Sequence, residues 1–392
     1  MTHPARERLW SRDFALLFAA MLLFWSSFLA LLPTIPLLLM QQLRASLADV
    51  GAISAVMALA AIAVRPAAGY ALDRWGRKWL FLASLVLFGA ICPLYALVTS
   101  VGQAFVIRAW HGVPFGIATG ASMALAGDLA PPSRRGEALG VFVLTQTVAM
   151  AVSPTVAMAI LGTAAYSRVF LWATILGAAS FAMAFRIRYP NVRDSAARLT
   201  AASMLEQRVL ATALTAGLIG IAHGGVVTFI SLYAHQLRLA NLGLYYFANA
   251  SGQVLSRLVA GGLYDRRGPR SVVPAGVAML VTGYVILGVV PRPDALLSAG
   301  LILGVGFGLT FPALQAMTIE QVKPQRRGAA SATFFNGFDL GISAGSFTLA
   351  FVAQALGGYS GMFLVSGGLV ALAFVAFFAA ALPAYRRWKT DA

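Results

Sequence analysis

The chain carries one charged pattern twice, at positions 192 residues apart. Residues 65–78 read RPAAGYALDRWGRK, and residues 257–270 read RLVAGGLYDRRGPR. The same offset relates further landmarks: Arg134, Arg135 and Gly136 correspond to Arg326, Arg327 and Gly328, and Gly112 and Gly116 correspond to Gly304 and Gly308. Since one constant offset holds over so long a stretch, the sequence is a duplication, and we expect the chain to fold as two similar halves.

Apolar runs fill the space between these polar landmarks. Of the chain, 59% is hydrophobic and only 11% is charged, whereas soluble domains are about 25% charged. A run of roughly 20 apolar residues crosses a bilayer as a helix. The runs that we identify are 14–40, 49–72, 79–99, 103–127, 138–162, 168–187, 209–234, 242–264, 271–290, 295–319, 328–356 and 359–382. They predict an all-α membrane protein with twelve transmembrane helices in two pseudo-symmetric six-helix bundles.

The long polar segment in the middle of the chain marks the expected boundary between the bundles. We predict an N-terminal bundle over residues 1–187, a cytoplasmic linker over 188–208 and a C-terminal bundle over 209–392. The other loops are too short to hold a soluble catalytic domain.

The net charge of +16 is distributed unevenly over the predicted loops. Of the 29 Lys and Arg residues, 22 fall in the termini and in the loops on one side, four fall on the other side and three fall inside spans. Cytoplasmic loops of membrane proteins carry this excess. We therefore predict a multi-pass protein of the cell membrane, the inner membrane of a bacterium, with both termini in the cytoplasm. The basic surface favours contact with anionic lipid and is no sign of nucleic-acid binding.

The most specific motif lies at residues 69–78, in the turn after the second span. Its residues are Gly69, Asp73, Arg74, Gly76, Arg77 and Lys78, and its partial copy consists of Gly261, Asp265, Arg266 and Gly268. Together with Arg108 and Gly112 in the span 103–127 and the Pro-x-Arg-Arg-Gly loop at 132–136, this pattern resembles the major facilitator superfamily over the whole chain. The resemblance implies the major facilitator fold, in which two bundles enclose a central path.

The charges of this motif suggest a gate on the cytoplasmic side. Gly69 allows another backbone to approach closely. Asp73 stands at the membrane boundary, where its carboxylate can accept hydrogen bonds from a helix N-terminus or an arginine. Asp128 ends its span on the same side, and Glu320 is its counterpart in the second half. We expect this acid–base cluster to latch the halves together in an outward-facing state; the alternative is that its charges only set the topology.

Asp339 is the most specific candidate for a functional side chain inside the membrane. It is the one acid placed well within a predicted span, about 11 residues or roughly 16 Å from the cytoplasmic end. Ionisable groups at such depth are costly and mark function by default. Arg65 lies about 12 Å beyond Asp73 along its helix, and the resemblance implies that the two helices face each other. We therefore predict a proton-coupling pair of Asp339 and Arg65, with a permanent structural ion pair as the alternative.

A second helix face complicates this prediction. Gly337, Gly341 and Gly345 are spaced four apart, so they lie on one face that favours close packing with another helix. Asp339 points away from this face, and both surfaces cannot meet the span that carries Arg65.

Other polar and aromatic residues inside the spans are candidates for a substrate cavity. They are Trp25, His111, Gln146, His223, Asn249, Gln253, Phe311, Gln315 and Asn336. His111 and His223 are more typical of cavity or packing residues than of metal ligands. The sequence has no His, Asp and Glu cluster with metal-ligand spacing, so we expect neither a metal nor a cofactor.

The resemblance implies secondary active transport of a small organic solute by alternating access. The segments FGLTFPALQA and FFNGFDLGISAG resemble bacterial permeases of the sugar-efflux and drug-efflux types, so we expect proton-coupled export by a monomer. The chain has no nucleotide-binding loop of the Gly-x4-Gly-Lys-Ser/Thr type and no catalytic constellation, which argues against an ATP-driven pump and a membrane-embedded enzyme. Proton-coupled uptake of a small metabolite and a non-transporting sensor or scaffold remain the alternatives.

Overall fold

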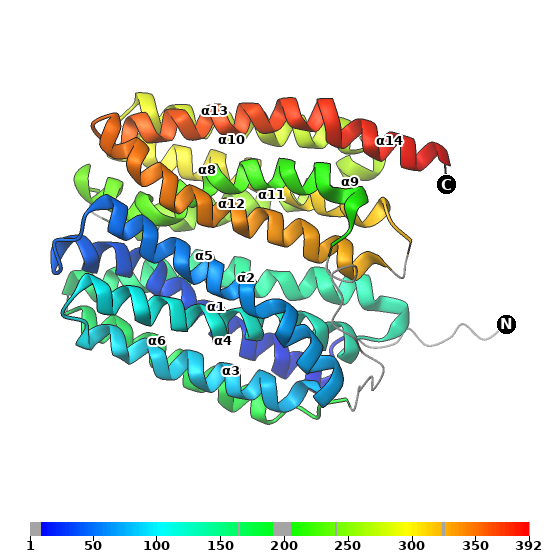
Figure 1. The fold of residues 1–392 in the computed structure, drawn as a ribbon, viewed down its shortest axis with the longest axis horizontal. Helices are drawn as coiled ribbons and strands as arrows, with labels where there is room; N and C mark the ends of the chain where they lie inside the picture. Colours follow the sequence, from blue (N-terminus) through cyan, green and yellow to red (C-terminus); the bar gives the residue numbers. More distant parts are fainter. Residues whose placement is uncertain (1–8, 164, 191–204, 240, 324–325, 392) are drawn as a thin grey trace.

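The computed structural model describes residues 9–163, 165–190, 205–239, 241–323 and 326–391. Within them the helices run side by side in two groups, one from each half of the chain (Figure 1). The first group contains α1 (Arg12–Gln41), α2 (Leu47–Trp75), α3 (Arg77–Ile91), η1 (Cys92–Leu97), α4 (Val101–Leu129), η2 (Pro132–Arg134), α5 (Arg135–Thr163) and α6 (Tyr166–Phe185). The second contains η3 (Gln207–Val209), α8 (Leu210–Gln236), α9 (Gly243–Arg267), α10 (Pro269–Val289), α11 (Pro293–Glu320), α12 (Arg327–Ala355), α13 (Tyr359–Ala376), η5 (Phe377–Ala381) and α14 (Leu382–Asp391).

The predicted spans each correspond to one of these helical segments, with η1 completing α3, and with η5 and α14 extending α13. Ten of the segments in the described residues are long and apolar enough to cross a membrane. The other two are α4 and α9. Their windows are less hydrophobic because α4 carries Arg108 and His111, and α9 carries Asn249, Gln253 and Arg257. Polar residues inside spans thus lower the hydropathy of the helices that hold several candidate site residues.

Local sequence explains where several helices begin and end. Ser11, Ser46 and Ser100 each precede a helix, and each side-chain oxygen accepts a hydrogen bond from a backbone N–H of the first turn, as helix caps do. Gly76 and Gly268 end α2 and α9 with φ values of 90° and 67°. Such φ values favour glycine, so the repeated glycine of the charged motif is required by the same turn in both halves.

The helices pair in the same way in both halves. In the first half α1 packs against α5 and α6, α2 against α4, and α3 against α4 and α6. In the second half α8 packs against α12 and α13, α9 against α11, and α10 against α11 and α13. Each helix pair in the second half corresponds to a helix pair in the first half, with both helices shifted by six spans. The duplication therefore holds in the packing as well as in the sequence.

Close glycine contacts repeat with the pairing. A side chain at Gly112 or Gly116 would collide with the α2 backbone at Met57 or Ala61. Gly304 and Gly308, the counterparts in α11, lie in the same way against Asn249 and Gln253 of α9. Small residues at this spacing let two helices touch backbone to backbone.

The two halves meet through α2 against α12, α5 against α9 and α1 against α8. In Figure 1, α1 begins and α14 ends at the same end of the bundle. We call it the basic end, because most of the described Lys and Arg residues belong to helix ends and loops on that side. Hydrogen bonds near the opposite end join Gln41 with His235 (3.0 Å), Thr155 with the Gly243 carbonyl (2.9 Å) and Ser343 with the Ala55 carbonyl (2.9 Å). Toward the basic end, Gly69, Gly140 and Gly261 have open space where a side chain would begin. The halves are thus joined tightly near the opposite end.

Most of the predicted linker, residues 191–204, lies outside the described residues. Its last residues continue into η3 and α8.

Candidate functional site

An ion pair joins the two halves inside the bundle. Nη1 of Arg65 in α2 donates to Oδ2 of Asp339 in α12 at 2.5 Å, and the same nitrogen lies 3.4 Å from Oδ1 of Asn336. Asn336 and Asp339 are three residues apart and share one face of α12. About a quarter of each charged side chain is exposed (25% for Arg65 and 24% for Asp339). The pair is therefore half-buried between the halves.

The glycine face of α12 lies against a different helix. Gly337, Gly341 and Gly345 contact the α8 backbone at Ala213, Gly217 and Ile221. A side chain built on Gly337 would come within 2.8 Å of the Ala213 carbonyl oxygen. α12 thus packs one face on α8 within its own half and presents Asp339 to α2 in the other half. The glycine face and Asp339 therefore do not compete for the helix that carries Arg65, as the sequence had suggested they would.

A second pair occupies the symmetry-related place. Nη1 of Arg257 in α9 donates to Oγ1 of Thr147 in α5 at 2.5 Å. Arg257 follows Arg65 by 192 positions, and Thr147 precedes Asp339 by 192 positions. The α2–α12 and α5–α9 interfaces therefore each contain an arginine contact at the same repeat position, with an acid as its partner in the first and a hydroxyl in the second. Sequence reasoning missed Thr147, although the repeat offset applied to Asp339 points to it.

The charged motif at the basic end forms contacts within the first half. Arg77 makes an ion pair with Asp128 at the end of α4. Lys78 lies over the Trp79 ring, 4.8 Å from its centroid, and Arg74 lies 6.0 Å from the centroid of the Tyr70 ring. Asp73 is in the last turn of α2, but its side chain lies outside the described part of the chain. The predicted latch between the halves stays a prediction.

Glu320, the counterpart of Asp128 in the second half, contacts a different part of the chain. Glu320 accepts a hydrogen bond from the Tyr385 hydroxyl and lies 3.6 Å from Lys389, and its backbone carbonyl accepts from Trp388. These partners belong to α14. Asp265 and Arg266 are exposed at the end of α9. Glu320 thus connects α11 with the C-terminal helix.

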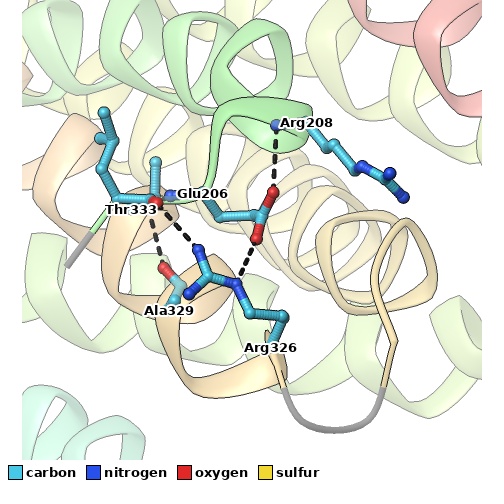
Figure 2. A network of polar contacts seen from close by, with 6 residues as sticks. Glu206, Arg208, Arg326, Ala329 and Thr333 are labelled. Atoms are coloured by element: carbon cyan, nitrogen blue, oxygen red, sulfur yellow. Dashed lines mark hydrogen bonds and ion pairs between the residues drawn. The ribbon is translucent and has the colours of Figure 1, made fainter. Parts of the chain in front are cut away.

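A third polar network ties the end of the linker to α12 (Figure 2). Nε of Arg326 donates to Glu206 at 2.8 Å, and its Nη2 donates to the Leu205 carbonyl at 3.1 Å. The Glu206 backbone N–H donates to Thr333, whose hydroxyl in turn donates to the Ala329 carbonyl. Thr333 precedes Asp339 by six residues on the same helix. The chain that leads into the second half is therefore held against the helix that carries the acid.

Three of the predicted cavity residues face neighbours within their own half. His111 is fully buried and lies 3.1 Å from the Tyr95 hydroxyl. Asn249 donates to the Gly300 carbonyl of α11 at 3.1 Å and accepts from Gln253 at 2.9 Å. In this structure these side chains pack between helices instead of lining the interface between the halves.

Arg108 of the α4 motif is also deeply buried. Its exposed fraction is 6%, and its Nε and Nη1 atoms have no hydrogen-bond partner among the described residues. Gly112, one turn later, contacts α2. The motif therefore lies in the packing between α4 and its neighbours.

The other candidates are partly exposed or join aromatic clusters. Gln146 is exposed, while Gln315 and Asn336 are half-buried. Trp25 packs against Phe115 in the first half, with ring centroids 5.7 Å apart. His223, Phe307 and Phe311 form a stack in the second half, with centroid separations of 4.9 and 5.1 Å. Phe115 and Phe307 are repeat counterparts that sequence reasoning did not select, although the same offset relates them.

The described residues contain no group of three or more His, Cys, Asp or Glu side chains that could hold a metal ion.

Comparison with known proteins identifies the family. The model of the Major Facilitator Superfamily matches residues 16–249 and 212–391. An uncharacterised MFS-type transporter of Methanocaldococcus jannaschii is 20% identical over 333 residues, which cover 81% of this chain and 85% of that protein. Another, YhhS of Escherichia coli K12, is 29% identical over 205 residues, so that the match spans about half of each chain.

Solved structures show the same fold. A mutant of the nucleoside transporter NupG superposes with a TM-score of 0.79 at 14% identity and covers 93% of this chain and 99% of its own. Because the family model covers nearly the whole chain and the fold agrees, the protein belongs to the Major Facilitator Superfamily of membrane transporters.

Proposed function

We propose that this transporter exports a small organic solute from the cytoplasm in exchange for protons, and that Asp339 carries the proton. The observation that supports this proposal most directly is the ion pair between Arg65 and Asp339, which connects α2 and α12 across the two halves. A carboxylate inside a membrane protein is costly unless it has a function or a partner, and this one has a partner in the opposite half.

The chemistry of the pair couples proton binding to movement. A deprotonated Asp339 accepts a charge-assisted hydrogen bond from Arg65, which is stronger than a neutral one. A proton on Asp339 removes its negative charge and with it most of the attraction that joins α2 to α12. Protonation thus favours separation of the halves at this point, and deprotonation favours closure. The proton can then bind in one conformation and leave in another, as alternating access requires.

The orientation of the chain follows from its charges. With 22 of its Lys and Arg residues in the termini and loops of one side, the basic end faces the cytoplasm. The halves are joined near the opposite end, so this conformation belongs to the inward-facing side of the cycle. An exporter takes up its solute in that conformation.

The interior favours a solute with an apolar body. Trp25 and Phe115 in the first half and the His223, Phe307 and Phe311 stack in the second half offer aromatic surfaces. Aromatic rings bury much apolar area and pack against other rings. These surfaces and the few polar groups of the interface suit a compact organic molecule.

Transport by inside-out vesicles tests both direction and coupling. Vesicles with the basic end outward receive an imposed pH gradient, acidic inside, and a panel of drugs, sugars and metal-chelating metabolites. We expect one class of solute to accumulate and to discharge the gradient, and the Asp339→Asn variant to do neither. Accumulation only in right-side-out vesicles with an acidic exterior would instead assign proton-coupled uptake.

A further inference from the structure

The two arginine contacts between the halves differ in charge. Arg65 has the carboxylate of Asp339 as its partner, whereas Arg257 has the hydroxyl of Thr147. The donor atom, the 2.5 Å separation and the position in the repeat are the same. The duplication therefore retained the arginine in both halves and an acid in only one.

This difference leaves positive charge inside the membrane. The charged side chains well within the described spans are Arg65, Arg108, Arg257 and Asp339. Asp339 compensates Arg65, and Arg257 makes no ion pair with any described residue. A guanidinium group away from bulk water is costly without an opposite charge. The interface between α5 and α9 thus has an arginine but, among the described residues, no acid to neutralise it, unlike the interface between α2 and α12.

The described surroundings of Arg257 do not enclose it completely. Its side chain is half-buried, and the guanidinium group has five N–H donors, of which Thr147 engages one nitrogen. Toward the basic end, Gly140 of α5 and Gly261 of α9 have open space beside them. Toward the opposite end, the Thr155 contact with Gly243 joins the same two helices. The group therefore lies where the contact between α5 and α9 opens toward the basic end.

We propose that Arg257, held in place by Thr147, binds the anionic group of the transported solute, and that this solute is a small organic anion such as a carboxylate. The inference rests on the proposed transport function and adds the substrate class to it. A planar guanidinium group matches a carboxylate through two parallel hydrogen bonds. The hydroxyl of Thr147 orients the arginine without neutralising it, whereas an acid at this position would occupy the site permanently. One half then responds to the proton and the other to the solute.

The test measures ligand-dependent thermal stability of the purified protein in detergent, without any gradient. The probes are benzoate and phenyl phosphate, with benzamide as the neutral control of similar shape. We expect both anions to raise the unfolding temperature in a saturable way, as a ligand of the folded state does, and benzamide to have no comparable effect.

Three variants connect binding to Arg257. Arg257→Gln removes the charge and should weaken anion binding by about tenfold or more. Thr147→Asp restores the acid that the other half has and should weaken anion binding similarly, while Thr147→Asn, its neutral isostere, should retain binding. Thr147→Asp gives Arg257 a carboxylate partner and leaves the arginine itself in place. The comparison of this variant with Thr147→Asn therefore tests the proposal even if Arg257→Gln unfolds.

Two results would overturn the proposal: no stabilisation of the wild-type protein by either anion, or equal stabilisation of the Thr147→Asp and Thr147→Asn variants. Stabilisation by phosphatidylglycerol alone would assign the site to a lipid headgroup and would also reject a transported anion. Anion binding is measured without any gradient, whereas proton coupling is measured in vesicles with an imposed gradient, so failure of proton coupling and failure of anion binding remain distinguishable.

Discussion

Arg65 and Asp339 are 274 positions apart in the chain, and their side chains lie 2.5 Å apart across the interface between the two halves. The contact joins the helix that leads into the charged motif with the helix that packs on α8. It is the one acid–base contact between the halves at this depth in the described residues. The predictions below begin with this pair.

Asp339→Asn should abolish accumulation driven by a pH gradient and leave solute binding measurable. Asparagine keeps the shape of the side chain and removes its charge and its proton. Transport into vesicles with and without the gradient, together with a binding assay, separates the two effects. Full gradient-driven transport by this variant would return Asp339 to a structural role.

Arg65→Ala should be severe by itself, because it leaves a carboxylate uncompensated in a half-buried site. Loss of one partner of such a pair costs about 3 kcal/mol or more. The double variant Arg65→Ala/Asp339→Asn has no orphan charge, so it should be no worse than the worse single variant. Unfolding temperatures and expression levels of the three variants check this expectation, and strictly additive losses would contradict it.

Asp73→Asn should impair transport and leave expression largely intact, because Asp73 stands at the boundary of the bundle. Asp265→Asn, its counterpart, should have a milder effect, since Pro269 occupies the place of Arg77 in the second copy. Transport rates at matched protein levels provide the measurement. Equal and negligible effects of both substitutions would reduce the motif to a topology marker.

Gly345→Ala should destabilise the protein by about 1–3 kcal/mol, as overpacking of a tight contact does. Its new methyl group would collide with the backbone carbonyl of Ile221 in α8. Gly140→Ala is the matched control, because its methyl group would enter open space in the second turn of α5. The control should be neutral or slightly stabilising, by up to about 1 kcal/mol. Thermal unfolding in detergent compares the two, and equal shifts would argue against a rigid contact between α8 and α12.

A reporter that is active only outside the cytoplasm, attached to Ala392, should give no signal. The basic loops on the side of the termini predict this orientation. The same reporter in the loop at Arg292 serves as the positive control. Strong activity at Ala392 would overturn the proposed orientation and the proposed inward-facing interpretation of this conformation.

The spans and the repeat were predictable because a bilayer requires long apolar helices and a duplication repeats its landmarks. The structure at the ends of two predicted spans could not be predicted from the sequence. The span predicted at 79–99 changes to a 3-10 helix from Cys92, where Pro93 cannot donate its backbone hydrogen bond. The span predicted to end at 382 continues as α14 to Asp391, because Glu320 holds this helix through Tyr385 and Lys389. Such contacts depend on distant residues.

The pairing partners in the candidate site were predictable only in part. Depth along each helix placed Arg65 and Asp339 at similar levels before the structure placed them together. The sequence could not predict which way the side chains of Asn249 and Gln253 point. A polar side chain inside a span needs a hydrogen-bond partner, and that partner is known only when the neighbouring helix is known. In this fold the neighbour is α11.

The two faces of α12 have a mechanical consequence. Its glycine face allows backbone contact with α8, so the two helices resist sliding or bending independently. Its other face holds Asp339 against α2 in the opposite half. We therefore expect a change at this carboxylate to act on α8 and α12 as one unit, and not on α12 alone.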